Sequence, residues 1–184
     1  MHLNPYGEDA VNLAADLANR RPTSAEELAD RCRAAGLVLA HSVTPEDLDR
    51  THATLDAWEK VVDTTDEQER AELVNGMLAA AATHPRLTNH AGSGWHLHHR
   101  DDQQSLGAVL FALIPVGTAL HLAGRGMHRL LRCAVTECPT IFADTSRTGR
   151  QRYCSPRCAN RDAVRRHRAN RTKNRDPKPT GRTR

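Results

Sequence analysis

Four of the five cysteines lie close together near the carboxyl end, as Cys133-x4-Cys138 and, after a spacer of fifteen residues, Cys154-x3-Cys158. Two close pairs with such a spacer are typical of a structural zinc site, because four thiolates can complete a tetrahedron around one ion. We therefore expect one zinc ion per chain. Disulfides or redox-active thiols are one alternative, and an iron–sulfur cluster is another, since thiolates also hold iron.

The residues around these cysteines predict the elements that position them. Residues 141–144 and 151–153 could pair as two strands. Ser155-Pro156 supplies a hydroxyl N-cap with proline at the first helical position, so a helix should run from Pro156 to about Thr172 with Cys158 in its first turn. This treble-clef-like unit is too small to fold on apolar burial alone. Zinc, which contributes about 10–16 kcal/mol in finger peptides, would supply most of its stability.

The predicted helix is rich in arginine. Arg157, Arg161, Arg165 and Arg168 follow one another at steps of four, four and three, which aligns them on one face. Guanidinium groups bind phosphates and guanine edges, so this face could lie against a DNA duplex. A merely solvated charged face is the alternative, although we expect no interleaved acids to pair with it. The candidate nucleic-acid contacts are Arg147, Arg150, Arg152, Arg157, Asn160, Arg161, Arg165, Arg166, Arg168 and Arg171.

Asn160 carries two hypotheses. Its amide could read an adenine edge if the first turn of the helix enters the major groove. It could equally brace the zinc ligands through hydrogen bonds, as residues around a metal site commonly do. Cys32, the fifth cysteine, lies in the first half of the chain and is expected to be a small core residue rather than a further ligand.

The charge is divided unevenly along the chain, whose net charge is +4. Residues 1–128 hold ten Arg and Lys against 18 Asp and Glu, whereas residues 129–184 hold 16 against four. This asymmetry predicts an acidic body and a basic end that binds a polyanion. We divide the chain into a helical domain (1–128), a zinc finger with its basic helix (129–172) and a disordered basic tail (173–184) that adds contacts to the nucleic-acid backbone.

The first domain predicts a mainly α fold. Helical periodicity and capping signals place helices at about 10–20, 25–35, 45–62, 66–82 and 105–124, the last of which Pro115 should kink or divide. A short β-hairpin could lie between Pro85 and Arg100. We judge the apolar runs shorter than the roughly 18 residues that span a bilayer, so no membrane segment is expected. With no export signal at the first residues, we expect a cytoplasmic protein, associated with the nucleoid when bound to DNA.

Histidines in this domain invite a metal-enzyme hypothesis. His96-x-His98-His99, with His121 and His128 further on, could supply imidazole ligands. No H-E-x-x-H, G-x-S-x-G or phosphate-cradling loop accompanies them, so we expect no enzyme and interpret them as packed or solvent-facing. A small-molecule pocket lined by Trp58 and Trp95 is the alternative to core packing of these rings. The domain would then act as a sensor or as a homodimerisation unit.

A longer pattern overlies the cysteines. It consists of Phe142-x-Asp144-x-Ser146-Arg147, then Arg152-Tyr153-Cys154-Ser155, then Cys158-Ala159-Asn160-Arg161. In these residues the chain resembles the CGNR zinc finger. Asp16-Leu17-Ala18-Asn19, followed by Glu27-Leu28 and Ala35-Gly36-Leu37, is similar to the ABATE domain that usually precedes that finger. The resemblance implies a stress-response transcription regulator that binds DNA through the finger.

Three positions depart from the family pattern. Ala159 stands where the signature has glycine, Tyr153 where tryptophan is usual, and Ala163 where a lysine commonly follows. Alanine at 159 is tolerable if the position is helical, because no positive φ is then required. The missing lysine removes one phosphate contact.

Two other functions remain open. An RNA-binding zinc finger would use the same arginines but normally stacks unpaired bases on exposed aromatic rings, and only Phe142 and Tyr153 are available near the cysteines. A protein-interaction adaptor without direct nucleic-acid binding would need an exposed apolar patch.

Overall fold

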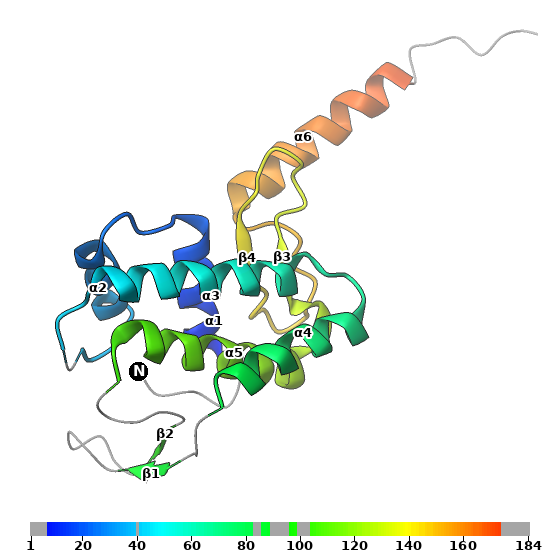
Figure 1. Cartoon of the computed structure of the whole chain (residues 1–184). Coiled ribbons are helices and arrows are strands. Elements are labelled where there is room, and N and C mark those ends of the chain that lie inside the picture. The colour runs from blue at the N-terminus through cyan, green and yellow to red at the C-terminus, as the bar shows by residue number, and fades with distance from the viewer. Residues whose placement is uncertain (1–6, 40, 83–85, 89–95, 99–103, 174–184) are drawn as a thin grey trace, which may run out of the picture.

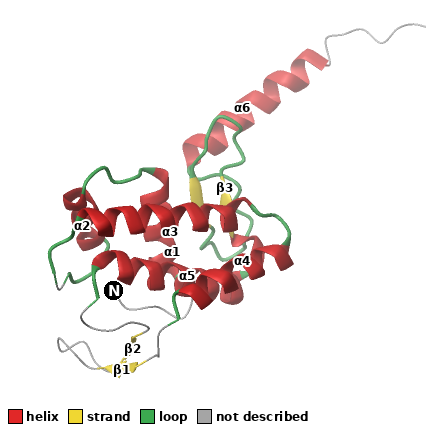
Figure 2. Ribbon diagram, viewed as in Figure 1, coloured by secondary structure: helices red, strands yellow, loops and turns green. Residues whose placement is uncertain are grey.

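The computed structural model describes residues 7–39, 41–82, 86–88, 96–98 and 104–173, and in them the fold is mainly helical, as predicted (Figures 1 and 2). The described helices between residues 8 and 125 build a helical body, and the helix at Pro156–Lys173 projects away from it (Figure 1). The helices are α1 (Glu8–Asn19), α2 (Ala25–Ala34), α3 (Pro45–Asp63), α4 (Glu67–Ala80), α5 (Leu106–Arg125) and α6 (Pro156–Lys173), with a 3-10 turn at Met127–Arg129. The strands are β1 (Arg86–Thr88), β2 (His96–His98), β3 (Leu130–Arg132) and β4 (Ile141–Ala143).

Helix α5 is the centre of the helical body and packs against α1, α3 and α4. Trp58 of α3 is fully buried in this core, and its indole N–H donates to Thr118 Oγ1 of α5 at 2.9 Å. Trp58 is therefore a core residue and does not line a pocket. The helix continues through the buried Pro115, so the predicted division does not occur. The prediction made for Trp95 lies outside the described residues.

The expectation that no apolar run reaches membrane length was wrong for α5. This helix has 20 residues, and the mean hydropathy of its most apolar window is 2.0. Among the described helices, it is therefore a helix that is long and apolar enough to cross a bilayer by length and composition. Yet 61% of that window is buried inside the protein. The apolar character of α5 is thus accounted for by its place at the centre of the core.

Capping interactions start the helices where the sequence predicted. Ser24 Oγ accepts from the Glu27 amide at 3.1 Å, and Thr44 and Asp47 form a reciprocal capping box at the start of α3. Asp47 does more, because its carboxylate also accepts from the Gly107 amide of α5 at 2.8 Å. Burial raises the pKa of Asp47, but hydrogen bonds from Ser105, Thr44 and Gly107 outweigh it and lower the pKa overall. This carboxylate ties the start of α3 to the start of α5.

Two of the predicted strand regions have different outcomes. The hairpin between Pro85 and Arg100 is present, with β1 and β2 antiparallel and Leu87 opposite Leu97. The side chains of both strands, with His96 and His98, and the whole of His99 lie outside the described residues.

The predicted pairing of residues 141–144 with 151–153 was wrong, because β4 pairs with β3 instead, with Leu131 opposite Phe142. This pairing places Leu130 and Ile141 in the main apolar core. Residues 151–153 begin with two exposed polar side chains and could not make that contribution. The burial of two aliphatic side chains therefore decides the strand partner.

Helices α1 and α5 approach each other closely at Gly117. A Cβ at this position would lie less than 3.0 Å from the Cβ of Ala10, closer than real Cβ atoms come. Gly7, at φ 63°, caps α1 against the same point, where a Cβ would overlap the Gly117 carbonyl oxygen. Any side chain here would push α1 away from the core helix.

We expect Gly117→Ala to lower the free energy of unfolding by about 1–3 kcal/mol, the usual cost of overpacking. Gly76→Ala on α4 is the matched control, because nothing lies within 4 Å of a Cβ there. This control should instead gain about 0.4–1 kcal/mol from the reduced entropy of the unfolded chain. Urea unfolding of zinc-loaded protein measures both changes, and equal effects of the two substitutions would contradict the close approach.

Candidate metal centre and basic helix

The four clustered cysteines converge on one point. Their Sγ atoms all lie within 4.8 Å of one another, and Cys154 Sγ lies 3.7 Å from both Cys138 Sγ and Cys158 Sγ. Zinc–sulfur bonds of about 2.3 Å give a tetrahedron with edges of about 3.8 Å. A disulfide would need about 2.05 Å, and all five cysteines are free. The donor set and its spacing therefore fit a single structural zinc ion.

Three segments present these ligands. Strand β3 leads directly into Cys133, whose amide donates to the Thr140 carbonyl at 2.9 Å and closes the turn that carries Cys138. Val135, only 1% exposed, fills the small space between Cys133 and Cys158. Ser155 Oγ accepts from the Cys158 amide at 3.3 Å and so caps α6 as predicted. Ala159 follows within the helix, so the glycine of the family signature is not required there.

The electrostatics of the cluster favour a bound cation. Hydrogen bonds from the Thr140 hydroxyl and amide lower the pKa of Cys138 to about 6, whereas burial raises the pKa of Cys154 to about 12. One thiolate thus forms readily, and the next is opposed by burial and by its charged neighbour. Zinc removes this opposition because its charge stabilises all the thiolates together. Arg161 adds a nearby positive charge, since its Nη2 lies 3.9 Å from Cys158 Sγ.

Other candidate ligands do not join this cluster. Cys32 is fully buried in the core of the helical body, where burial raises its pKa to about 12, as predicted for a packed residue. His121 is also fully buried, with its Nε2 at 3.3 Å from the Arg129 carbonyl oxygen, and His128 is exposed. Among the side chains that the structure describes, the four cysteines form the group that could hold a metal ion.

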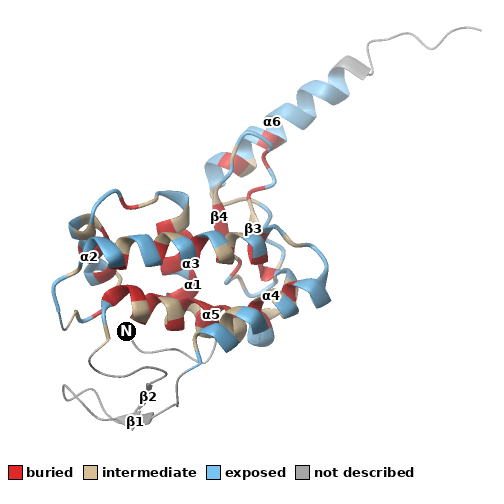
Figure 3. Ribbon diagram, in the orientation of Figure 1, coloured by how far each residue is buried: buried red, intermediate tan, exposed pale blue. Residues whose placement is uncertain are grey.

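The predicted nucleic-acid contacts are all exposed, on α6 and on the loop that precedes it (Figure 3). From Ala163 to Arg171 every residue of α6 is exposed, and the helix extends away from the helical body. Asn160 is exposed, and its side-chain amide has no hydrogen-bond partner among the described residues. The hypothesis that its amide braces the zinc ligands therefore has no support in the geometry. The predicted disordered tail (173–184) was wrong at Lys173, which is the last residue of α6, and residues 174–184 lie outside the described part of the chain.

The expectation of no interleaved acid in the basic helix was wrong. Asp162 lies on the inner side of α6, 8% exposed, and its carboxylate accepts from the Tyr153 hydroxyl at 2.7 Å. It also pairs with Arg165 at 2.8 Å and with Arg166 at 3.0 Å. The Tyr153 hydrogen bond is the main cause that lowers the pKa of Asp162. Sequence reasoning missed this residue because it considered which arginines share a face of the helix and did not consider the acidic residues that could pair with them.

A buried ion pair shapes the loop that carries Arg147 and Arg150. The Asp144 carboxylate accepts from the amides of Ser146 at 2.9 Å and Gln151 at 3.0 Å. Arg129 lies beneath the loop and donates to the carbonyls of the same Asp144 and Ser146, at 3.2 and 2.5 Å. Asp144 was part of the family pattern, but no sequence signal marked Arg129.

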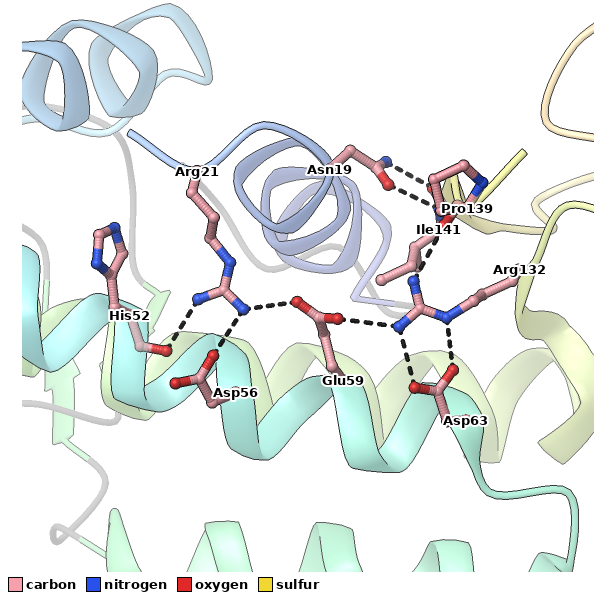
Figure 4. A network of polar contacts seen from close by, with 9 residues as sticks. All are labelled: Asn19, Arg21, His52, Asp56, Glu59, Asp63, Arg132, Pro139 and Ile141. Atoms are coloured by element: carbon pink, nitrogen blue, oxygen red, sulfur yellow. Dashed lines mark hydrogen bonds and ion pairs between the residues drawn. The ribbon is translucent and has the colours of Figure 1, made fainter. Parts of the chain in front are cut away.

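A polar network joins the β3–β4 hairpin to the helical body (Figure 4). Asn19, at the end of α1, pairs with the Ile141 backbone as another strand would, donating to its carbonyl at 2.8 Å and accepting from its amide at 2.7 Å. Arg132 of β3 binds both carboxylate oxygens of Asp63 at 2.6 and 3.0 Å, and Glu59 at 2.9 Å. The hairpin that carries the first two zinc ligands is thus fixed on α1 and α3.

Two family models match the chain. The model of the CGNR zinc finger matches residues 129–171. The ABATE model, described as "Putative stress-induced transcription regulator", matches residues 11–134. The chain belongs to the ABATE family. A comparison with curated proteins finds no match.

These matches confirm the resemblance drawn from the sequence motifs. The regions matched by the ABATE and CGNR models overlap at residues 129–134, where β3 leads into the first zinc ligand. The family descriptions are those of a regulator and a zinc finger, not of an enzyme, and they support a regulatory role. A regulator of transcription also fits a cytoplasmic protein.

We expect purified, reduced protein to contain about one zinc ion per chain, and Cys154→Ser to contain almost none, because three thiolates leave the tetrahedron open. Cys32→Ala is the control and should keep its zinc, although it leaves a small cavity in the body. Elemental analysis after gel filtration measures the content. Full zinc occupancy in the Cys154→Ser variant would contradict the assigned ligand set.

We expect Asn19→Ala to lower the free energy of unfolding by about 1–3 kcal/mol, since it removes two hydrogen bonds to the Ile141 backbone. Asn12→Ala is the control, because Asn12 is an exposed residue of the same helix and the two substitutions have similar effects on helix propensity. Denaturant unfolding of the zinc-loaded protein compares them. An equal loss of unfolding free energy in both variants would show that the hydrogen bonds between Asn19 and Ile141 do not stabilise the protein.

Proposed function

We propose that the chain is a DNA-binding transcription regulator whose zinc-stabilised finger and arginine-rich α6 contact duplex DNA. The observation that carries the proposal is the exposure of α6, on which every residue from Ala163 to Arg171 faces solvent. The 18 residues of α6 give a length of about 27 Å, and a major groove of about 12 Å in width admits such a helix. The uneven distribution of charge also favours α6 as the part that contacts DNA, because the acidic helical body would be repelled by phosphates.

The exposed arginines divide by their place. Arg147 and Arg150 lie on the loop held by Asp144, and Arg157, Arg168 and Arg171 lie on α6. All five have exposed side chains suited to phosphate contacts. Such contacts position the protein on the duplex and release counterions, so they make binding dependent on salt.

The helical body would act in ligand sensing or in homodimer formation. An open hollow of about 350 Å³ lies between α1 and α2, with Asp9, Asp16 and Arg31 among its lining residues. Its size lies at the lower end of the range for small-molecule sites. We propose this hollow as the place for a small polar ligand.

The aromatic residues favour duplex DNA over RNA. Tyr153 is partly buried and its hydroxyl is bound to Asp162, and Phe142 on β4 is buried. Neither ring stands free to stack an unpaired base. RNA binding, and an adaptor role without nucleic-acid binding, are therefore outcomes that the following test must distinguish.

We expect the zinc-loaded full-length protein to bind duplex DNA more tightly than single strands or structured RNA, with affinity falling steeply as salt rises. Arg157→Gln should reduce the slope of log affinity against log salt by about 1, one phosphate contact. Arg33→Gln, an exposed arginine of the helical body, should leave the slope unchanged. Fluorescence anisotropy at several salt concentrations measures these values. Preference for RNA, or no binding at low salt, would overturn the proposal.

A further inference from the structure

The exposed face of α6 contains an apolar side chain that the fold does not use. Val164 is 51% exposed, and among the described residues only Val38 is a comparably exposed large hydrophobic side chain. It belongs to neither apolar cluster of the protein. Valine is also a weaker helix former than alanine or arginine, because its branched side chain is restricted in a helix. Neither packing nor helix stability therefore explains a valine at this position.

Asn160 lies directly beside Val164, one turn earlier on the same face of α6. Residues four apart in a helix are neighbours on its surface. Asn160 is exposed, and its side-chain amide makes no hydrogen bond within the described part of the chain. Cys158 and Asp162, which are buried, define the opposite, inner side of the helix. The Asn160–Val164 pair therefore faces away from the zinc ion and from the rest of the protein.

The neighbouring arginines are engaged on the inner side. Arg161 reaches back to Cys158 Sγ at 3.9 Å. Arg165 and Arg166 pair with Asp162, and Arg165 also lies 3.5 Å from Glu137. These contacts hold the guanidinium group of Arg161 beside a zinc ligand, and those of Arg165 and Arg166 against Asp162. They leave an amide and an isopropyl group outermost, bordered by the arginines at 157 and 168.

These two side chains match the chemistry of one kind of base pair. An asparagine amide can bind the N6 and N7 positions of adenine with two hydrogen bonds, and an apolar side chain can contact the C5-methyl group of thymine. Four residues of helix advance about 6 Å, and successive base pairs lie about 3.4 Å apart. The two side chains thus fall about two base steps from each other when the helix lies along the groove.

We propose that Asn160 and Val164 are the specificity-determining residues of α6, and that they read an adenine and a nearby thymine in the major groove of duplex DNA. The inference rests on the proposed function, since it requires α6 to enter the groove. It adds that preference among sites resides in two uncharged residues, while the outer arginines supply affinity that is common to all sequences.

The test uses full-length, zinc-loaded protein and the duplex it selects from a random pool. In that duplex each thymine in turn is replaced by deoxyuridine, which lacks only the methyl group, and each adenine by 7-deazaadenine, which lacks the N7 acceptor. We expect wild type to lose about fourfold in affinity at one thymine, the contribution of one buried methyl group, and to lose affinity at one adenine. Val164→Ser should abolish the first loss and Asn160→Ala the second.

Ala163→Ser is the matched control, because Ala163 is the exposed neighbour of Val164. It should respond to both modified bases as wild type does, and all variants should keep one zinc ion and the same affinity for unselected DNA. The inference would be overturned if Val164→Ser and Asn160→Ala bound the duplex and still distinguished the modified bases as wild type does. That result would leave the proposed function intact. Absence of duplex binding at low salt would overturn both.

Discussion

The bond between four thiolates and one divalent cation determines where α6 lies. Each thiolate comes from a different structural setting: a strand end, a tight turn, a loop and the first turn of a helix. Only a small apolar cluster around Val135 surrounds them, which is too little to hold these segments together. The free energy of metal binding is therefore the main contribution to the order of this region. An exposed helix that projects from the protein gains its fixed direction from this bond at its first turn.

The β3–β4 hairpin transmits this order to the rest of the molecule. Its Leu130 and Ile141 side chains belong to the main core, while Cys133 belongs to the zinc cluster. Asn19 and Arg132 fix the same hairpin on α1 and α3 through directed hydrogen bonds. A shift of α1 or α3 would therefore move the hairpin and, through the zinc ion, the direction of α6. The hollow between α1 and α2 lies against one of these two helices, so the ligand that we propose for it would have a short mechanical connection to the basic helix.

Sequence reasoning predicted the features that depend on near neighbours and on spacing. The cysteine ligands, the Ser155 cap and the helices of the body follow from residues close together in the chain. The partner of β4 could not be found in this way, because it was decided by burial of Leu130 and Ile141 against α1 and α3, which are distant from the hairpin in sequence. Asn19 was visible in a family motif, but its role needed the position of Ile141. The length of α5 was readable from the sequence and was misjudged.

Asp162 shows why a count of arginines does not give the number of DNA contacts. The 16 basic residues after position 128 suggest a uniform positive surface, but one buried carboxylate binds two of them and also orients Tyr153 beside the zinc ligands. Releasing those arginines to phosphates would leave a charged oxygen without partners in a poorly solvated position, and this cost would offset the free energy of the new phosphate pairs. The same pairs hold α6 at its root, so charge is used there for rigidity. In the DNA complex that we propose, affinity would then come from the more distant part of the helix and from the loop carrying Arg147 and Arg150, on either side of the uncharged pair at 160 and 164.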